Sequence, residues 1–331
     1  MTVASAPGKA ILLGEHAVVY GRPAIAVPIC DRRAFASATS ARRGSGVVLQ
    51  AVDLGRRYPG DGNCVDDDGR LLQAALRGVL YELGVSGEGL DLEITIRSEI
   101  PIARGMGSGA AVSAALMRAV AQHLGAELGA ERLSRLVFQT ERLLHGTPSG
   151  IDNTTVAYEQ PIWFVTGQRP EPIRIETGLT LLIGDTSVPA RTHEAVDMVR
   201  ARWQAARGAM EAQFDAIADI VTRARAALAT GNLPELGHLM NQNQAILADI
   251  GVSSGALNRL IVAAREAGAL GAKLSGGGMG GCMIALVRES DRAAVQQALQ
   301  QAGAAEVITS DVSRGILVMG EHAEQGDEHA R

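Results

Sequence analysis

Three glycine-containing stretches of this sequence carry side chains that could handle phosphate groups. In the first, PIARGMGSGA at 101–110, glycines stand at 105, 107 and 109, just before a run that reads as a helix. The first helical turn holds no carboxylate, so its free N–H groups and the positive end of the helix dipole would face an anion. Glycine also lets the backbone approach that anion closely. We therefore interpret the stretch as a phosphate-binding loop; a tight turn before a core helix is the alternative.

The surroundings of these glycines limit the kind of nucleotide loop. A Walker loop needs a lysine after its last glycine, and none follows here. Residues 105–110 match the G-x-G-x-x-[GA] pattern of dinucleotide-binding proteins. They lie in mid-chain, however, and no acidic residue ends a strand about 20 residues later. A dinucleotide-dependent oxidoreductase is therefore a distant alternative.

The second stretch, KLSGGGMGGC at 273–282, places five glycines in six positions, which one turn cannot explain. A loop that lies against a bulky anion, or against the first loop, explains them better than a flexible surface loop, because apolar residues flank it on both sides. It also contains Lys273, which with Lys9 is one of only two lysines among 31 basic residues. Both are candidates for a task that needs a compact ammonium group, with chance as the rival explanation.

The third stretch, TERLLHGTPSGIDN at 140–153, holds two carboxylates. Glu141 falls in the last turn of a predicted helix, where it opposes the helix dipole at a cost of roughly a few tenths of a kcal/mol. A bound cation would offset that cost; a solvated surface glutamate is the alternative. Asp152 follows a rigid Pro-Ser-Gly turn, and His145 reads as a helix-end cap. Two carboxylates near a phosphate loop indicate Mg²⁺-assisted phosphoryl transfer.

A further pair of polar residues, Glu15 and His16, ends the apolar run of GKAILLGEHAVVYG at 8–21. An acid and an imidazole at the end of a core strand cost folding free energy unless they are exposed or paired.

Alternating strands and helices must position these motifs. Residues 1–30 read as two strands around a turn at 14–21, and 40–70 as loops and short edge strands. The period-two alternation at 90–96 predicts a half-buried strand. Further strands are predicted at 179–184, 282–287 and twice near the end of the chain, with helices at 69–83, 112–124, 131–144, 192–230, 234–248, 255–267 and 291–302. We place the domains at 1–167 and 168–320, followed by a frayed polar tail at 321–331.

The composition is that of a globular protein, with 47% hydrophobic and 20% charged residues. Aromatic residues make up only 3%, so the core must be aliphatic. A net charge of −5 argues weakly against a nucleic-acid-binding protein. The three cysteines lack the spacing of a zinc site or a disulfide framework. Since no secretory leader or membrane span is evident, we expect a cytoplasmic enzyme or binding protein.

These motifs, in this order, resemble those of the GHMP kinases, and the resemblance covers nearly the whole chain. PGKAILLGEHAVVYG is the most specific; with HGTPSGIDN and KLSGGGMGGC it is similar to the members that phosphorylate mevalonate. Galactokinases carry an Asp-containing stretch after Glu-His, and phosphomevalonate kinases usually carry Glu-Tyr. The resemblance implies an α+β fold: a ribosomal-protein-S5-like N-terminal domain with a mixed sheet and left-handed crossovers, a ferredoxin-like C-terminal domain, and the site between them.

The family's catalytic and nucleotide-binding roles carry over to matching positions. Asp152 would be the base that faces the substrate hydroxyl, with Lys9 beside it keeping the carboxylate ionised. Glu141 would ligate Mg²⁺. The two glycine loops would contact ATP through Arg104, Gly105, Met106, Gly107, Ser108, Gly109, Ala110, Gly276, Gly277 and Gly278.

The family also implies a substrate side. Glu15 and His16 would border the mevalonate pocket, and Thr192 resembles a substrate-side residue less specifically. The expected reaction is ATP-dependent phosphorylation of mevalonate to its 5-phosphate by direct in-line transfer. The rivals are a sister kinase or the related decarboxylase acting on another small hydroxy acid, and a nucleotide-binding regulator without transfer activity. A homodimer is possible; a nucleic-acid or membrane partner is not expected.

One position departs from the family. The phosphate loop of relatives usually ends in two serines, and the second is credited with binding Mg²⁺; here Gly109 takes its place. Either Ser108 or water must fill that coordination position. We expect water, because Ser108 at a helix start would already be engaged in capping.

Overall fold

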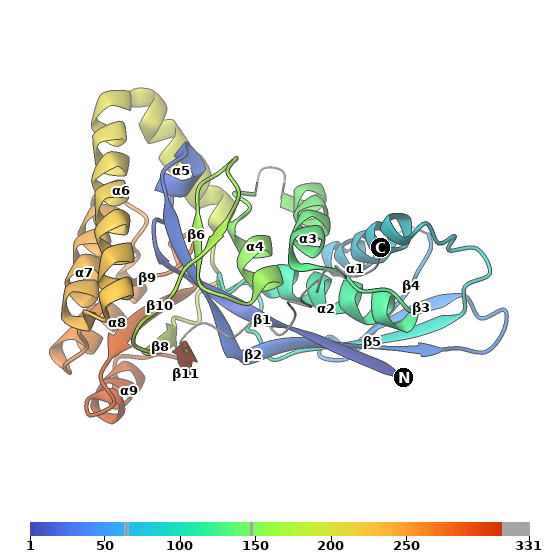
Figure 1. Cartoon of the computed structure of the whole chain (residues 1–331). Helices are drawn as coiled ribbons and strands as arrows, with labels where there is room; N and C mark the ends of the chain where they lie inside the picture. Colours follow the sequence, from blue (N-terminus) through green and yellow to red (C-terminus); the bar gives the residue numbers. More distant parts are fainter. Residues whose placement is uncertain (63, 65, 146–147, 313–331) are drawn as a thin grey trace, which may run out of the picture.

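The first half of the chain forms a seven-stranded sheet with helices on one face (Figure 1). The computed structural model describes residues 1–312 apart from 63, 65, 146 and 147. The strand order is β4-β3-β5-β2-β6-β7, and β1 pairs with β2. The strands are β1 (Thr2–Leu13), β2 (Ala24–Ser40), β3 (Val47–Ala51), β4 (Arg56–Pro59), β5 (Leu92–Ser98), β6 (Ile162–Phe164) and β7 (Glu171–Pro172). β3 and β5 run parallel while the other pairs are antiparallel, so the sheet is mixed, as the resemblance implies.

One helix of this half, α2 (Ser108–His123), positions the site because it packs very close to the sheet. The helices of this half are the 3₁₀ helix η1 (Ala17–Tyr20), α1 (Asp67–Leu83), α2, α3 (Ala130–His145) and α4 (Ile151–Tyr158). Small side chains of α2, among them Ala111, Ala114 and Ala115, are fully buried. Because these side chains are short, α2 can lie close against β1 and β2. The loop before α2 is therefore held on a rigid base.

The second half forms a four-stranded antiparallel sheet in the order β11-β8-β10-β9. Its strands are β8 (Leu179–Asp185), β9 (Gly271–Leu274), β10 (Cys282–Val287) and β11 (Glu306–Val312). Its helices are α5 (Thr192–Ala205), α6 (Arg207–Thr230), α7 (Leu233–Ile250), α8 (Gly255–Glu266) and α9 (Arg292–Gln301). Numbered by their order in the chain, the strands lie across the sheet as fourth, first, third, second, with helices between the first and second and between the third and fourth. That is the ferredoxin-like order, so the implied α+β fold is confirmed.

The element boundaries differ from the predicted ones in a few places. β7 at 171–172 pairs with β6, so the first sheet continues a few residues past the predicted boundary at 167. β6 and β9 were not predicted because strands of only three or four residues leave no readable period. One closing strand, β11, is present; the second predicted closing strand and the tail at 321–331 fall outside the described residues.

The core is aliphatic, as the low aromatic content predicts. Among the largest fully buried side chains Phe214 is the single aromatic one, and most of the others are leucine and isoleucine. In the part of the chain that the structure describes, no helix combines the length and apolar character needed to cross a membrane.

Candidate active site

A cavity of about 800 Å³ lies where the two halves meet. The phosphate-loop candidate at 104–109, the second glycine loop at 276–277, the end of β1 and the starts of α4 and α5 all line it. This volume lies in the range of small-molecule sites, which cover roughly 300–1,000 Å³. The motifs that the sequence singled out therefore converge on one cavity.

Lys9 and Asp152 form an ion pair in this cavity. The Lys9 Nζ lies 2.8 Å from the Asp152 Oδ1, and the side chains are 3% and 31% exposed. Lys9 is held by β1, where its N–H donates to the Met106 carbonyl at 2.9 Å. Gly107 has φ +72°, and a Cβ there would lie 2.9 Å from the Lys9 Cγ. A glycine is thus required at 107 both for its backbone conformation and for the path of the lysine side chain.

Glu141 is buried beside this pair, in the last turn of α3, so the alternative of a solvated surface glutamate is wrong. Its pKa is raised to about 8, chiefly by burial and then by the Asp152 charge, while Lys9 opposes the rise. A carboxyl group with so high a pKa lacks enough positive charge around it. A cation bound in the cavity would supply that charge.

The phosphate-loop candidate ends in an open helix N-terminus. The first turn of α2 holds no acidic side chain, and its N–H groups point out of the helix end. The N-cap residue is Gly107, and no side chain makes a capping hydrogen bond. The expectation that Ser108 caps this helix is therefore wrong: Ser108 is the first helical residue, because the left-handed backbone of Gly107 already starts the helix. Its hydroxyl is available to a ligand.

The second glycine loop packs against the first, as predicted. Its glycines are buried, and a Cβ on Gly276 would lie 3.5 Å from the Gly105 carbonyl. A Cβ on Gly277 would lie 3.0 Å from the Thr192 Cα, and one on Gly281 2.9 Å from the Arg104 carbonyl. The flexible-surface alternative is therefore wrong. The glycines are needed because backbone passes backbone on several sides.

The remaining predicted site residues divide into two groups. Thr192 begins α5 and lines the cavity. Arg104 also lines it, but its Nε donates to Asp185 at 2.9 Å, so the side chain ties the first loop to the end of β8. Ala110 is buried inside α2, and Gly278 faces Val252; neither belongs to the described cavity lining.

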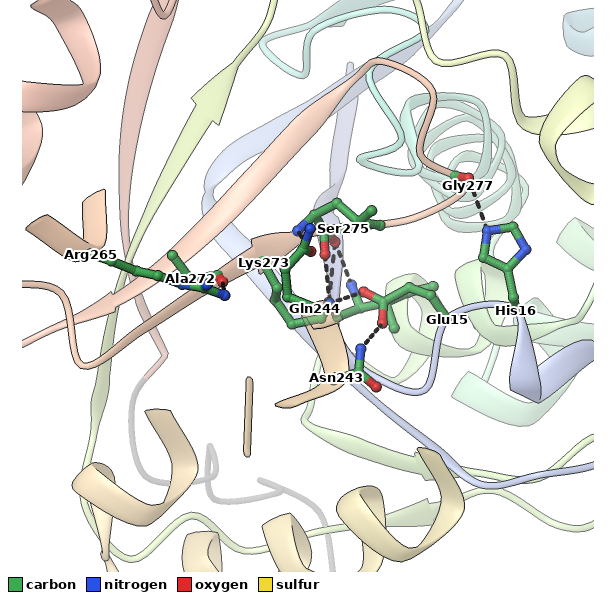
Figure 2. A network of polar contacts seen from close by, with 11 residues as sticks. Glu15, His16, Asn243, Gln244, Arg265, Ala272, Lys273, Ser275 and Gly277 are labelled. Carbon is green, nitrogen blue, oxygen red and sulfur yellow. Dashed lines mark hydrogen bonds and ion pairs between the residues drawn. The ribbon is translucent and has the colours of Figure 1, made fainter. Parts of the chain in front are cut away.

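Glu15 and His16 follow β1 and are paired rather than exposed (Figure 2). The Glu15 carboxylate forms an ion pair with Lys273 and accepts from the Asn243 amide at 3.3 Å. The His16 Nε2 lies 2.9 Å from the Gly277 carbonyl. Burial raises the pKa of Glu15, although Lys273 opposes this, and burial lowers that of Lys273. Both residues of the pair predicted from the sequence line the cavity, and their partners come from the second half.

Sequence reasoning missed several residues that line the cavity. At one end are residues of the β3–β4 turn and the start of α1, and at the other is the inward face of α5: Asp53, Leu54, Asp67, Asp68, Leu71, Leu72, His193, Asp197 and Arg200. They have ordinary residue types in ordinary elements and gave no local signal. Lys273 did give one, because it is one of only two lysines.

The donor atoms present fit a magnesium ion held together with a nucleotide. Within the described residues, no group of three or more His, Cys, Asp or Glu side chains could hold a metal alone. Mg²⁺ is usually bound through one or two carboxylates, water and substrate phosphates. Glu141, with its raised pKa, would be the carboxylate for such an ion, and the Ser108 hydroxyl would be a second oxygen donor.

Comparison with known proteins covers both halves of the chain. The GHMP kinases N terminal domain matches residues 70–160, and the GHMP kinases C terminal domain matches residues 224–305. Mevalonate kinase of Pyrococcus horikoshii is 35% identical, over 96% of this chain and 97% of that protein. Mevalonate kinase of Aeropyrum pernix is 37% identical over 87% and 89%. The crystal structure of L. major mevalonate kinase in complex with R-mevalonate has a TM-score of 0.82 at 29% identity, and the match covers 95% and 96% of the two chains.

Proposed function

The chain belongs to the GHMP kinase family, and on that premise we propose that it transfers the terminal phosphoryl group of ATP to the 5-hydroxyl of mevalonate. The chain acts as a mevalonate kinase. Relatives of that name match nearly its whole length, and a mevalonate-bound member of the group shares its fold.

The Lys9–Asp152 pair is the observation that carries the mechanism. Asp152 is the member of the pair that is open to the cavity, because its side chain is 31% exposed whereas that of Lys9 is only 3% exposed. The 5-hydroxyl oxygen forms its bond to the terminal phosphorus as the bridging P–O bond to ADP breaks, and the hydroxyl proton passes to the Asp152 carboxylate. The Lys9 ammonium contacts this carboxylate and holds the hydroxyl near it.

The phosphates of ATP lie at the N-terminus of α2. The N–H groups of Ser108, Gly109 and Ala110 have no acceptor inside the helix, and no carboxylate competes with them in the first turn. Backbone donors in this position stabilise phosphate oxygens without moving during the reaction. Gly276 and Gly277 close the site from the other side.

Glu141, with Ser108 as a further oxygen donor, would hold the magnesium ion. When bound, the ion neutralises charge on the phosphate oxygens. The Asp152 charge raises the pKa of Glu141, so a cation at Glu141 would also offset the repulsion between these two carboxyl groups.

The test is coupled ADP release with a panel of acceptors: mevalonate, phosphomevalonates, homoserine and galactose. We expect turnover with mevalonate and background rates with the others. Turnover with another acceptor would identify a sister kinase, release of carbon dioxide a decarboxylase, and ATP binding without turnover a regulator. A cytoplasmic location and a homodimer stay predictions, to be checked by fractionation and by light scattering.

A further inference from the structure

The end of β1 is fastened to the second glycine loop at three points. The Ile11 N–H donates to the Ser275 Oγ at 3.0 Å, and the same hydroxyl donates to the Ile11 carbonyl at 3.2 Å. Further along the chain, Glu15 pairs with Lys273, and His16 contacts Gly277. We call these contacts the clasp. Each joins the first half of the chain to the second at the wall of the cavity.

The charged part of the clasp is sealed from water. The side chains of Glu15 and Lys273 are 0% exposed, and the Asn243 amide donates to the second carboxylate oxygen at 3.3 Å. Removing both charges from water is costly, and a well-packed apolar pair often stabilises a fold equally well or better. Stability alone therefore does not explain an ion pair at this position. The pair does give this segment one fixed geometry, because a short ammonium–carboxylate contact tolerates little displacement.

The next residue, His16, has its ring fixed in one tautomer. A carbonyl oxygen only accepts hydrogen bonds, so the contact with Gly277 places the imidazole proton on Nε2. The other nitrogen, Nδ1, is then an acceptor, and it has no hydrogen-bond partner among the described residues (Figure 2). The His16 backbone has φ +61°, which is unusual for a residue with a side chain and requires support from its neighbours.

We propose that Lys273 is a positioning residue for acceptor binding. Through Glu15 it fixes the backbone of residues 15–16, so that His16 donates to Gly277 and presents Nδ1 to a hydroxyl of the acceptor. This rests on the proposed function. Mevalonate has two hydroxyl groups; the 5-hydroxyl faces Asp152, so the 3-hydroxyl is the donor that remains. Its carboxylate cannot be the partner of Nδ1, because two acceptors do not form a hydrogen bond.

The charges around His16 support this assignment. The pKa of His16 is lowered to about 4, chiefly by burial; the Gly277 contact opposes this change and the Lys273 ammonium adds to it. The ring is thus neutral at pH 7, as an Nδ1 acceptor requires. Lys273 contributes to the site twice, by geometry through Glu15 and by its charge toward His16.

The first test compares Lys273→Met with the double variant Glu15→Gln/Lys273→Met. The single variant leaves a buried carboxylate without a counter-charge, so its melting temperature should fall. The double variant should recover most of that loss in melting temperature. For both we expect KM for mevalonate to rise about tenfold or more, as for loss of a hydrogen bond to substrate, with KM for ATP and kcat within a few-fold. If the double variant regains normal KM together with stability, the pair is merely structural and the proposal is wrong.

A matched control contacts the same strand from a neighbouring helix. Arg265, from α8, is half-buried and donates to the Ala272 carbonyl in β9 at 2.6 Å. Arg265 lies on the side of Lys273 that faces away from the site (Figure 2). Arg265→Met removes this cation and should lower stability without changing KM for mevalonate. An equal rise in KM for this variant would mean that any damage to β9 weakens acceptor binding, which contradicts a specific role for Lys273.

The second test uses the analogue 5-hydroxy-3-methylpentanoate, which lacks the 3-hydroxyl. We expect the unchanged protein to prefer mevalonate over this analogue by about tenfold or more in kcat/KM, and Lys273→Met to lose most of that preference. Equal preference in both proteins would overturn the proposal.

A third measurement needs no acceptor and so separates this proposal from the assignment of mevalonate. In ¹⁵N spectra of histidine-labelled protein, the signals missing from His16→Gln identify His16. We expect a neutral ring protonated at Nε2 at pH 7, and a changed signal in Lys273→Met. A charged ring, or a proton on Nδ1, would overturn the proposal whatever the acceptor is.

Discussion

The two lysines of this chain form two ion pairs that differ in their exposure to water. Lys9 and Asp152 are 3% and 31% exposed, whereas Lys273 and Glu15 are both 0% exposed. Lys9, Asp152 and Glu15 line the same cavity. A carboxylate that is one-third exposed can meet a substrate and accept its proton. A sealed carboxylate cannot, and its contribution is to hold backbone in place. We therefore expect the same pairing of residue types to serve chemistry in one case and geometry in the other.

The largest effect expected is on the open pair. Asp152→Asn removes the proton acceptor, so kcat should fall by about 10² or more, as for loss of a positioned general base. ATP binding should be nearly unchanged. Stopped-flow single turnovers measure the chemical step, and nucleotide titration checks binding. Turnover within a few-fold of the unchanged protein would mean that Asp152 is not the base.

The matched change in the sealed pair, Glu15→Gln, should act on stability. It leaves the Lys273 ammonium buried without its counter-charge, and breaking a buried pair on one side costs about 3–5 kcal/mol. We expect a large drop in the denaturant midpoint and a kcat within a few-fold at saturating substrates. A variant with a normal midpoint and a lost kcat would reverse the roles assigned to the two pairs.

The sealed region should also make the fold sensitive to acid through His16. Its pKa is about 4 in the folded chain and about 6.5 when unfolded. Below pH 6.5 the unfolded chain therefore binds a proton that the folded chain does not. The contribution of His16 to the free energy of unfolding is fully present above pH 6.5. It is lost as the pH drops toward 4, by about 3 kcal/mol in total. His16→Gln should flatten the slope of unfolding free energy between these values, whereas the same change at the exposed His238 should not.

A smaller effect is expected at the carboxylate next to the open pair. Glu141→Gln replaces a charged ligand by a neutral one, so the Mg²⁺ concentration for half-maximal rate should rise by about tenfold. Glu131→Gln, at the exposed start of the same helix, is the control. An unchanged magnesium titration would remove Glu141 from the metal site.

The smallest effect concerns the departure from the family at Gly109. Since Ser108 does not cap α2, its hydroxyl is free to act as a ligand. Ser108→Ala should raise the magnesium requirement by about threefold, because water replaces the hydroxyl readily. Gly109→Ser in that background should lower it again; a Cβ there meets only Leu71, at 3.8 Å. If neither change moves the titration, water alone fills the position.

The sequence predicted the open pair better than the sealed one, for a physical reason. The resemblance to the GHMP kinases implied that Lys9 lies beside Asp152, because both residues stand in motifs of that family. The partner of Glu15 lies 258 residues away on a four-residue strand without a readable period. Only the scarcity of lysine pointed to Lys273, without indicating its partner.

The prediction that Ser108 caps α2 was wrong because the backbone conformation overrides the preference of serine for the N-cap position. Serine is favoured at the N-cap. Here Gly107 takes that position, because its left-handed φ of +72° starts α2 one residue earlier and lets Lys9 pass. Nothing in the sequence distinguishes these starting points, since either residue can begin a helix. The long alternating and apolar segments were predicted well because they face a core along their whole length.

The clasp also sets when the site can come into existence. Its contacts join residues 264, 258 and 261 positions apart. On a ribosome that adds roughly 5–20 residues per second, the first strand waits on the order of ten to fifty seconds for its partners. Throughout that time Glu15 is an ordinary hydrated carboxylate, and the left-handed turn at His16 has nothing to hold it. Lys9 is thus synthesised long before the glycine loop whose contacts complete the pocket around it.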